Sequence, residues 1–169
     1  MQRAGQAAAK KALELLPAAA RGTQVLALAG PGNNGGDALE AAAHLAQAGT
    51  HVSIVHFPPV GASSAERQTA LQRASASAAQ FLPYSEELVN SQPWALVIDG
   101  LLGIGLQRPL EGSMRQLVAQ INTLHCPILA LDVPSGPNHK TLGQAREQFT
   151  RDMNHLPLDK WPRATEYPA

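Results

Sequence analysis

The chain has 169 residues, of which 44% are hydrophobic and 15% charged, and its 13 basic and 13 acidic side chains give a formal net charge of zero. This length suits one domain with a proper core, and the composition excludes a disordered or collagen-like chain. The neutral balance gives no electrostatic reason to expect nucleic acid or an anionic membrane as a partner.

The cysteine content and the hydropathy of the sequence indicate in which cellular compartment the protein resides. The single cysteine, Cys126, cannot form an internal disulfide, which favours a reducing compartment. No run reaches the roughly 18 apolar residues that a membrane-spanning helix needs. Charged residues interrupt the alanine-rich start of the chain, where a signal peptide would need an apolar segment. We therefore expect a cytoplasmic protein.

Helical and strand patterns alternate along the chain as far as residue 132. Helices are predicted where alanine and leucine recur on one face, and strands where short runs are almost wholly apolar. In chain order, the predicted elements are a helix over Gln2–Leu16, a strand over Gln24–Ala29, a helix over Asp37–Ala48, a strand over His51–Phe57, a helix over Ser64–Leu82 that begins at Ser63 or Ser64, a strand over Trp94–Asp99, a helix over Ser113–Thr123 and a strand over Pro127–Asp132. This alternation is typical of an α/β fold with a mostly parallel sheet covered on both faces.

The last part of the chain has a different character. Residues 137–169 contain four prolines and no clear apolar strand, and only Gln144–Met153 is a candidate helix. The sequence therefore predicts one domain over residues 1–136, followed by a divergent tail over 137–169 that is partly disordered.

Three polar or glycine-rich segments follow predicted strands: Gly30–Asp37, Asp99–Arg108 and Asp132–Gly136. In parallel sheets, ligands bind outside the carboxyl ends of the strands. We therefore expect these segments to share one rim of the sheet.

The first of these segments matches the pattern G-x-G-x-x-G, whose backbone N–H groups can approach a phosphate. The dinucleotide fingerprint also needs an acidic residue at the end of the second strand, where this chain has His56 and Phe57. A nicotinamide-dependent dehydrogenase is therefore disfavoured, and the absence of Gly-Lys-Ser/Thr excludes a P-loop. The alternative for Asn33–Asp37 is a tight turn in which Asp37 caps the next helix.

Oxygen-bearing side chains recur at the ends of the last two predicted strands, as Asp99 and Asp132. Each alone is equally well explained by a helix cap or a loop hydrogen bond. Their coincidence with the asparagines and Ser135 favours a functional site. Arg108 is either a phosphate-neutralising or a solvated loop cation, and the histidines, which lack metal-ligand spacing, are interpreted as surface or packing residues.

Taken together, the segments Gly30–Asp37, Asp99–Gly112 and Leu131–Gly136 closely resemble the YjeF N-terminal domain family, whose best-known members are NAD(P)H-hydrate epimerases. The resemblance covers about residues 1–136. It implies a Rossmann-like three-layer α/β/α fold with more strands than the four predicted here. It also implies interconversion of the R and S forms of hydrated NADH and NADPH (NADHX and NADPHX), without hydride transfer.

The resemblance also implies roles for individual residues. Asp132 is the candidate catalytic proton carrier. A potassium ion is expected as cofactor, with Asn34, Asp99 and Ser135 as ligands. The implied substrate-binding residues are Asn33, Asn34, Gly35, Gly36, Asp37, Gly103, Ile104, Gly105, Leu106, Gln107, Arg108, Pro109 and Asp132.

The chain departs from the family pattern in three places. Ala38 stands where a glycine is usual, Ile104 stands where a threonine is common, and the sequence after Gly136 matches none of the remaining strands. The C-terminal end therefore looks truncated or altered, which would leave an open sheet edge. A non-catalytic dimerising or nucleotide-binding scaffold and a broken domain thus remain alternatives to the enzyme. The expected partner is the NAD(P)HX substrate, with a homodimer and coupling to an NAD(P)HX dehydratase left open.

Overall fold

The computed structural model describes residues 1–17, 22–103 and 112–132. Its elements, in chain order, are α1 (Gln2–Leu15), β1 (Gln24–Ala29), α2 (Asn33–Gln47), β2 (His51–His56), α3 (Ala65–Ala76), β3 (Gln80–Leu82), α4 (Glu86–Asn90), β4 (Leu96–Gly100), α5 (Gly112–Ile121) and β5 (Ile128–Ala130). The predictions made for residues 104–109, for Ser135 and for the tail lie outside the described residues.

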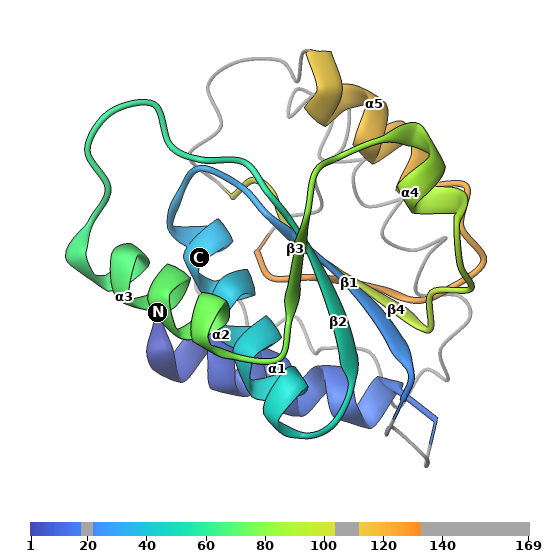
Figure 1. Cartoon of the computed structure of the whole chain (residues 1–169), viewed down its shortest axis with the longest axis horizontal. Coiled ribbons are helices and arrows are strands. Elements are labelled where there is room, and N and C mark those ends of the chain that lie inside the picture. The colour runs from blue at the N-terminus through green and yellow to red at the C-terminus, as the bar shows by residue number, and fades with distance from the viewer. Residues whose placement is uncertain (18–21, 104–111, 133–169) are drawn as a thin grey trace.

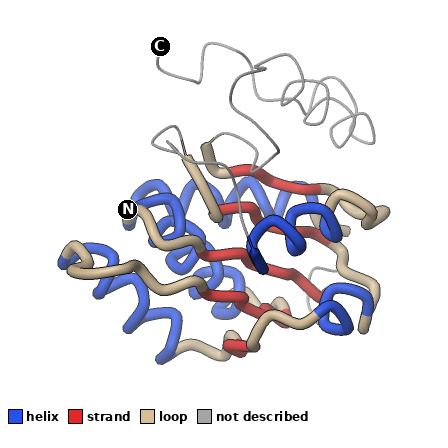
Figure 2. Tube along the Cα trace, turned by 90° about the horizontal axis from the view of Figure 1, so that it is seen from above, coloured by secondary structure: helices blue, strands red, loops and turns tan. Residues whose placement is uncertain are grey.

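The strands form one parallel sheet in the order β3-β2-β1-β4-β5. Helices α1, α2 and α3 cover one face, and α4 and α5 cover the other (Figures 1 and 2). The predicted α/β fold with a Rossmann-like three-layer arrangement is therefore confirmed. Within the described ranges, every helix is too short or too polar to span a bilayer.

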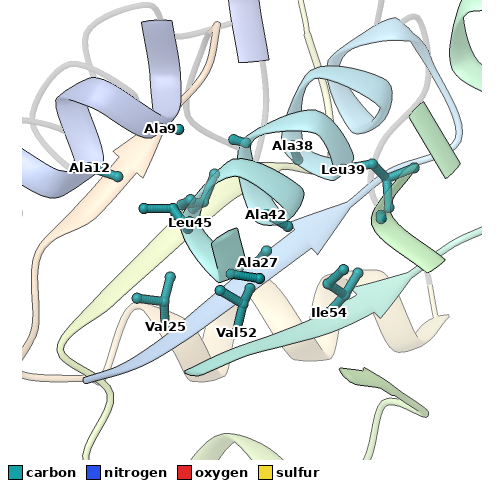
Figure 3. Close-up of a cluster of buried hydrophobic side chains, with 14 of the residues drawn as sticks. Ala9, Ala12, Val25, Ala27, Ala38, Leu39, Ala42, Leu45, Val52 and Ile54 are labelled. Carbon is teal, nitrogen blue, oxygen red and sulfur yellow. The ribbon is translucent and has the colours of Figure 1, made fainter. Parts of the chain in front are cut away.

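Alternating side chains of the strands build two separate cores. Val25 and Ala27 of β1 face α1 and α2, whereas Leu26 and Leu28 face α4 and α5. Figure 3 shows the first core, in which Ala42 of α2 lies among the side chains of β1 and β2. Small side chains let the helices approach the sheet closely, so the alanine richness of the chain serves packing.

The helix predicted over Ser64–Leu82 is wrong at its C-terminal end. Its start is confirmed, because Ser64 Oγ accepts a hydrogen bond from the backbone N–H of Arg67 at 3.3 Å. The helix ends at Ala76, and Gln80–Leu82 forms the short edge strand β3 instead. An edge strand of three residues, none of them fully buried, carries too little apolar periodicity to be detected.

Helix α2 begins at Asn33, four residues before the predicted start. Gly32 is its N-cap residue, and the N–H of Gly36 donates to the carbonyl oxygen of Gly32 at 3.4 Å. The asparagines and glycines interpreted as a turn therefore form the first turn of a helix. Asp37 is not the cap, because it already lies inside that helix. Tertiary packing overrides the low helix propensity of this run.

Candidate active-site cleft at the strand ends

A cleft opens at the carboxyl ends of β1 and β4, where the strand order changes direction. The two strands stay paired as far as the hydrogen bond from Gly30 N to Gly100 O, at 3.0 Å. Beyond it, β1 continues into α2 on one face of the sheet, and α5, on the other face, comes after β4 in the chain. Such a switch point leaves a crevice that parallel sheets use for ligands.

The cleft has a volume of about 550 Å³, which falls within the range typical of small-molecule sites. Residues from all three predicted segments line it: Pro31, Gly32, Asn33, Asn34, Asp37, Leu101, Leu102, Gly103, Leu131 and Asp132. The three strand ends thus converge on one cavity.

Asn34 connects two of the three segments. Its Nδ2 donates a hydrogen bond to the carbonyl oxygen of Leu102, in the loop after β4. An asparagine side chain also carries an oxygen that can face a cation and a second N–H that can face a ligand acceptor. Asn34 therefore joins the first turn of α2 to the loop after β4, at the cleft that both segments line.

Asp99 is not among the residues that line the cleft, and its side chain is buried, with the residue 3% exposed. Its Oδ1 accepts a hydrogen bond from the backbone N–H of Leu101 at 3.1 Å. The neighbouring Gly100 is packed against α2 so closely that a Cβ there would lie 2.8 Å from the backbone oxygen of Asn34. This contact places the end of β4 directly against the first turn of α2.

Asp132 and Gly103 meet at the cleft, next to the residue that accepts the hydrogen bond from Asn34. A Cβ on Gly103 would lie 2.5 Å from Asp132 Oδ2, so the glycine makes room for this carboxylate. The backbone N–H of Leu131 donates to Asp99 O at 3.0 Å, which fixes the end of β5 beside β4. Asp132 therefore lies at the cleft, just after the end of β5 and beside the loop after β4.

Asp37 brings a second carboxylate to the cleft from the first turns of α2. Its Oδ1 is buried and accepts no hydrogen bond from the described part of the chain, although it lies 3.6 Å from the N-terminal amino group. Burial raises the pKa of Asp37, the amino group opposes this effect, and the carboxylate of Glu40 adds to it. The charge of the N-terminal amino group therefore offsets part of the cost of burying this carboxylate.

The described site residues fall into two groups, those that line the cleft and those buried behind it. Asn33, Asn34, Asp37, Gly103 and Asp132 line the cleft, whereas three others support it from behind. Those three are Gly35, Gly36 and Asp99, all of them buried. A Cβ on Gly35 would overlap the carbonyl oxygen of Gly30, so this glycine serves close packing rather than ligand contact.

Sequence reasoning missed one buried charge beside the cleft. Arg67 of α3 is 3% exposed and donates to the carbonyl oxygens of Gly30 and Gly32, in the loop that leads into α2. His56, at the end of β2, accepts from the same guanidinium group. An arginine in a mostly polar helix gives no sequence signal of such burial, because arginine is normally exposed.

The side chains expected to hold a cation carry hard oxygen donors rather than the nitrogen and sulfur donors that zinc prefers. The described residues contain no cluster of three His, Cys, Asp or Glu side chains that could hold a metal. Asn34 and Asp99 instead offer amide and carboxylate oxygens, which suit hard cations. The side-chain hydroxyl of Ser135, the third expected ligand, belongs to the same class but lies outside the described residues.

Comparison with known proteins agrees with this geometry. The sequence model of the family described as "YjeF-related protein N-terminus" matches residues 1–153. The chain belongs to this family. The match extends beyond residue 136 into the segment predicted as a divergent tail.

Individual relatives agree with this assignment. A protein from Bordetella pertussis named NAD(P)H-hydrate epimerase is 50% identical over 136 residues, which are 80% of this chain and 57% of that protein. One of the same name from Limosilactobacillus fermentum is 37% identical over 146 residues, covering 83% of this chain and 65% of that protein. The crystal structure of yeast ynu0 (YNL200c) superposes with a TM-score of 0.67 at 21% identity, covering 83% of this chain and 64% of that one, and so shares its fold. This chain thus spans less than two thirds of the length of these relatives.

Proposed function

We propose that the chain epimerises hydrated NADH and NADPH, interconverting the R and S forms of NADHX and NADPHX. The observation that carries this proposal is the convergence of Asn34, Asp37 and Asp132 on one cleft at the switch point of the sheet. Membership of a family whose relatives are named NAD(P)H-hydrate epimerase supports it.

In this proposal, the loop before α2 and the first turn of that helix bind the diphosphate of the substrate. The first N–H groups of a helix have no partners within it and favour anions. Asn33 and Asn34 lie in that turn and face the cleft. The segment from Gly103 to Pro109 forms a further part of the binding site, although most of it lies outside the described residues.

Asp132 is the proposed proton carrier at the hydroxyl-bearing carbon of the damaged ring. Its carboxylate lies at the cleft beside Gly103, the residue after Leu102, to which Asn34 donates. A carboxylate positioned against a bound substrate can carry a proton to and from the reacting carbon. Asp37 also lines the cleft, where its side chain, 24% exposed, can accept a hydrogen bond from the substrate.

Asn34, Asp99 and Ser135 are the proposed potassium ligands. A bound potassium ion would supply positive charge that holds the substrate in place. The buried carboxylate of Asp99 is the charged member of this set, at the end of β4 against α2. We also propose that the protein is cytoplasmic. A homodimer and functional coupling to an NAD(P)HX dehydratase are further parts of this proposal.

The test is to mix purified protein with the R form of NADPHX and to follow its conversion by chiral-sensitive chromatography. We expect conversion well above the spontaneous rate in KCl, and a lower rate when choline chloride replaces KCl. Asn34→Ala should lose the potassium dependence together with most of the activity. A folded protein that converts the substrate no faster than buffer would refute the proposal and leave a binding scaffold.

A further inference from the structure

Arg67 is a cation buried behind the wall of the cleft. Its Nη2 donates to Gly30 O at 2.9 Å and to Phe57 O at 3.4 Å, and its Nε donates to Gly32 O at 3.3 Å. The same Nη2 lies 3.0 Å from His56 Nε2. The residue is only 3% exposed, so these contacts replace its hydration almost completely.

None of these acceptors carries a negative charge. Three are backbone carbonyl oxygens and the fourth is an imidazole nitrogen, which must be unprotonated to accept. The ion pairs of the described residues join Met1 to Asp37, Lys11 to Glu14 and Arg73 to Glu40, and Arg67 is in none of them. A buried charge without a carboxylate partner is unusual in a folded protein, because its desolvation is costly.

The contacts of Arg67 reinforce the direction of the peptide groups in the loop, where the carbonyl oxygen of Gly32 also accepts a hydrogen bond from the N–H of Gly36 in α2 at 3.4 Å. In a planar trans peptide, the carbonyl and the N–H group point in opposite directions. The carbonyl of Gly32 points to Arg67, so the N–H of Asn33 in the same peptide points away from Arg67. Asn33 and Gly32 both line the cleft. The guanidinium therefore helps to hold the carbonyl oxygen of Gly32 on the side of the loop opposite to the N–H of Asn33.

We propose that Arg67 is a positioning residue that acts on the substrate diphosphate through the loop at Gly30–Gly32. It holds the loop with its carbonyl groups turned inward, and its uncompensated charge attracts the anion across a single layer of backbone. The bound diphosphate then serves as the negatively charged partner that the buried guanidinium does not have within the described residues. This inference rests on the proposed function, because it takes the diphosphate of the hydrated coenzyme as the anion.

The test compares two substitutions of Arg67 that both provide hydrogen-bond donors but differ in charge. Arg67→Lys keeps the charge and Arg67→Gln removes it, while both keep a hydrogen-bond donor for the loop carbonyls. Lys10→Gln is the matched control, because it removes one positive charge from an exposed position on α1. Binding of ADP-ribose, which carries the diphosphate, and of adenosine, which carries no phosphate, is measured by isothermal titration calorimetry.

We expect Arg67→Gln to bind ADP-ribose about tenfold more weakly than Arg67→Lys, as befits one lost charge near an anion. Adenosine binding should be the same in both variants, and Lys10→Gln should behave as the unaltered protein. In the epimerase assay, the change should fall mainly on KM. If Gln at this position prevents folding, Arg67→Asn, which also keeps an uncharged amide donor, takes its place.

Equal ADP-ribose binding by the Lys and Gln variants would overturn the inference, as would a parallel loss of ADP-ribose and adenosine binding. The proposed function fails in a different way. An unaltered protein that binds ADP-ribose but does not epimerise NADPHX would refute the function and leave the role of Arg67 to be decided by the binding ratios.

Discussion

Replacing Gly100 by alanine should separate α2 from the sheet at the cleft. A Cβ at this position would lie 2.6 Å from Ala38 Cβ, 2.8 Å from the backbone oxygen of Asn34 and 3.1 Å from the backbone oxygen of Leu28. Carbon atoms in contact normally lie about 3.5–4.0 Å apart, so α2 or β4 would have to shift by roughly 1 Å. Overpacking of this kind costs typically about 1–3 kcal/mol of unfolding free energy.

A double-mutant cycle with Ala38→Gly identifies the cause of this loss. Ala38→Gly alone should cost about 1 kcal/mol, because glycine is unfavourable inside a helix. Combined with Gly100→Ala, it removes the Cβ–Cβ overlap, so the double variant should be more stable than the sum of the single effects predicts. We expect a coupling energy within about 0.5–3 kcal/mol, as is usual for residues in contact. Unfolding in urea, monitored by circular dichroism, gives all three values.

The same displacement should reduce the epimerase activity. Gly100 lies beside Asp99 and against Asn34, so a shift of about 1 Å changes their relative position and could cost up to about a hundredfold in rate. Ala38→Gly should restore only part of the activity, since the contact with Asn34 remains. Unchanged stability in Gly100→Ala, or additive effects in the cycle, would refute the close packing from which these values follow.

Other predictions concern stability and pH. Burial and the nearby Arg67 lower the pKa of His56 below its ordinary value of 6.5, so the unfolded chain binds more protons than the folded protein below neutral pH. The unfolding free energy should therefore fall as the pH drops from about 7.5 to 5. In His56→Gln, which removes this group, the unfolding free energy should depend less steeply on pH. Burial raises the pKa of Asp37, so the charged form of this side chain destabilises the fold at pH 7. Asp37→Asn should therefore raise the melting temperature at this pH and lower the epimerase activity. A lower melting temperature in this variant would contradict the argument. Leu45→Ala should cost about 2–5 kcal/mol in urea unfolding, because this side chain is fully buried in the core between α2 and the sheet; a loss below 1 kcal/mol would contradict the packing.

The sequence predicted the sheet well where strands are fully buried. The apolar runs of β1, β2 and β4 are buried on both faces, so hydrophobicity alone reveals them. It failed at β3, where three partly exposed residues gain their strand geometry only by pairing with β2. Edge pairing is a long-range property that a local pattern does not contain.

The start of α2 shows a related limit. Asn33–Gly36 have low helix propensity, yet they form the first turn of α2 because Gly35 packs directly on Gly30 and Gly36 on Met1. The sequence therefore located a segment that lines the cleft but not its conformation. The same holds for Arg67, whose burial depends on acceptors supplied by the loop before α2 and by the end of β2.

The most direct test of the account is the rate at which Asp132→Asn converts the R form of NADPHX in KCl. This substitution keeps the shape of the side chain beside Gly103 and removes its capacity to carry a proton. We predict a rate at least about a hundredfold below that of the unaltered protein, with the melting temperature preserved. An Asp132→Asn variant that epimerises as fast as the unaltered protein would contradict the role assigned to the cleft.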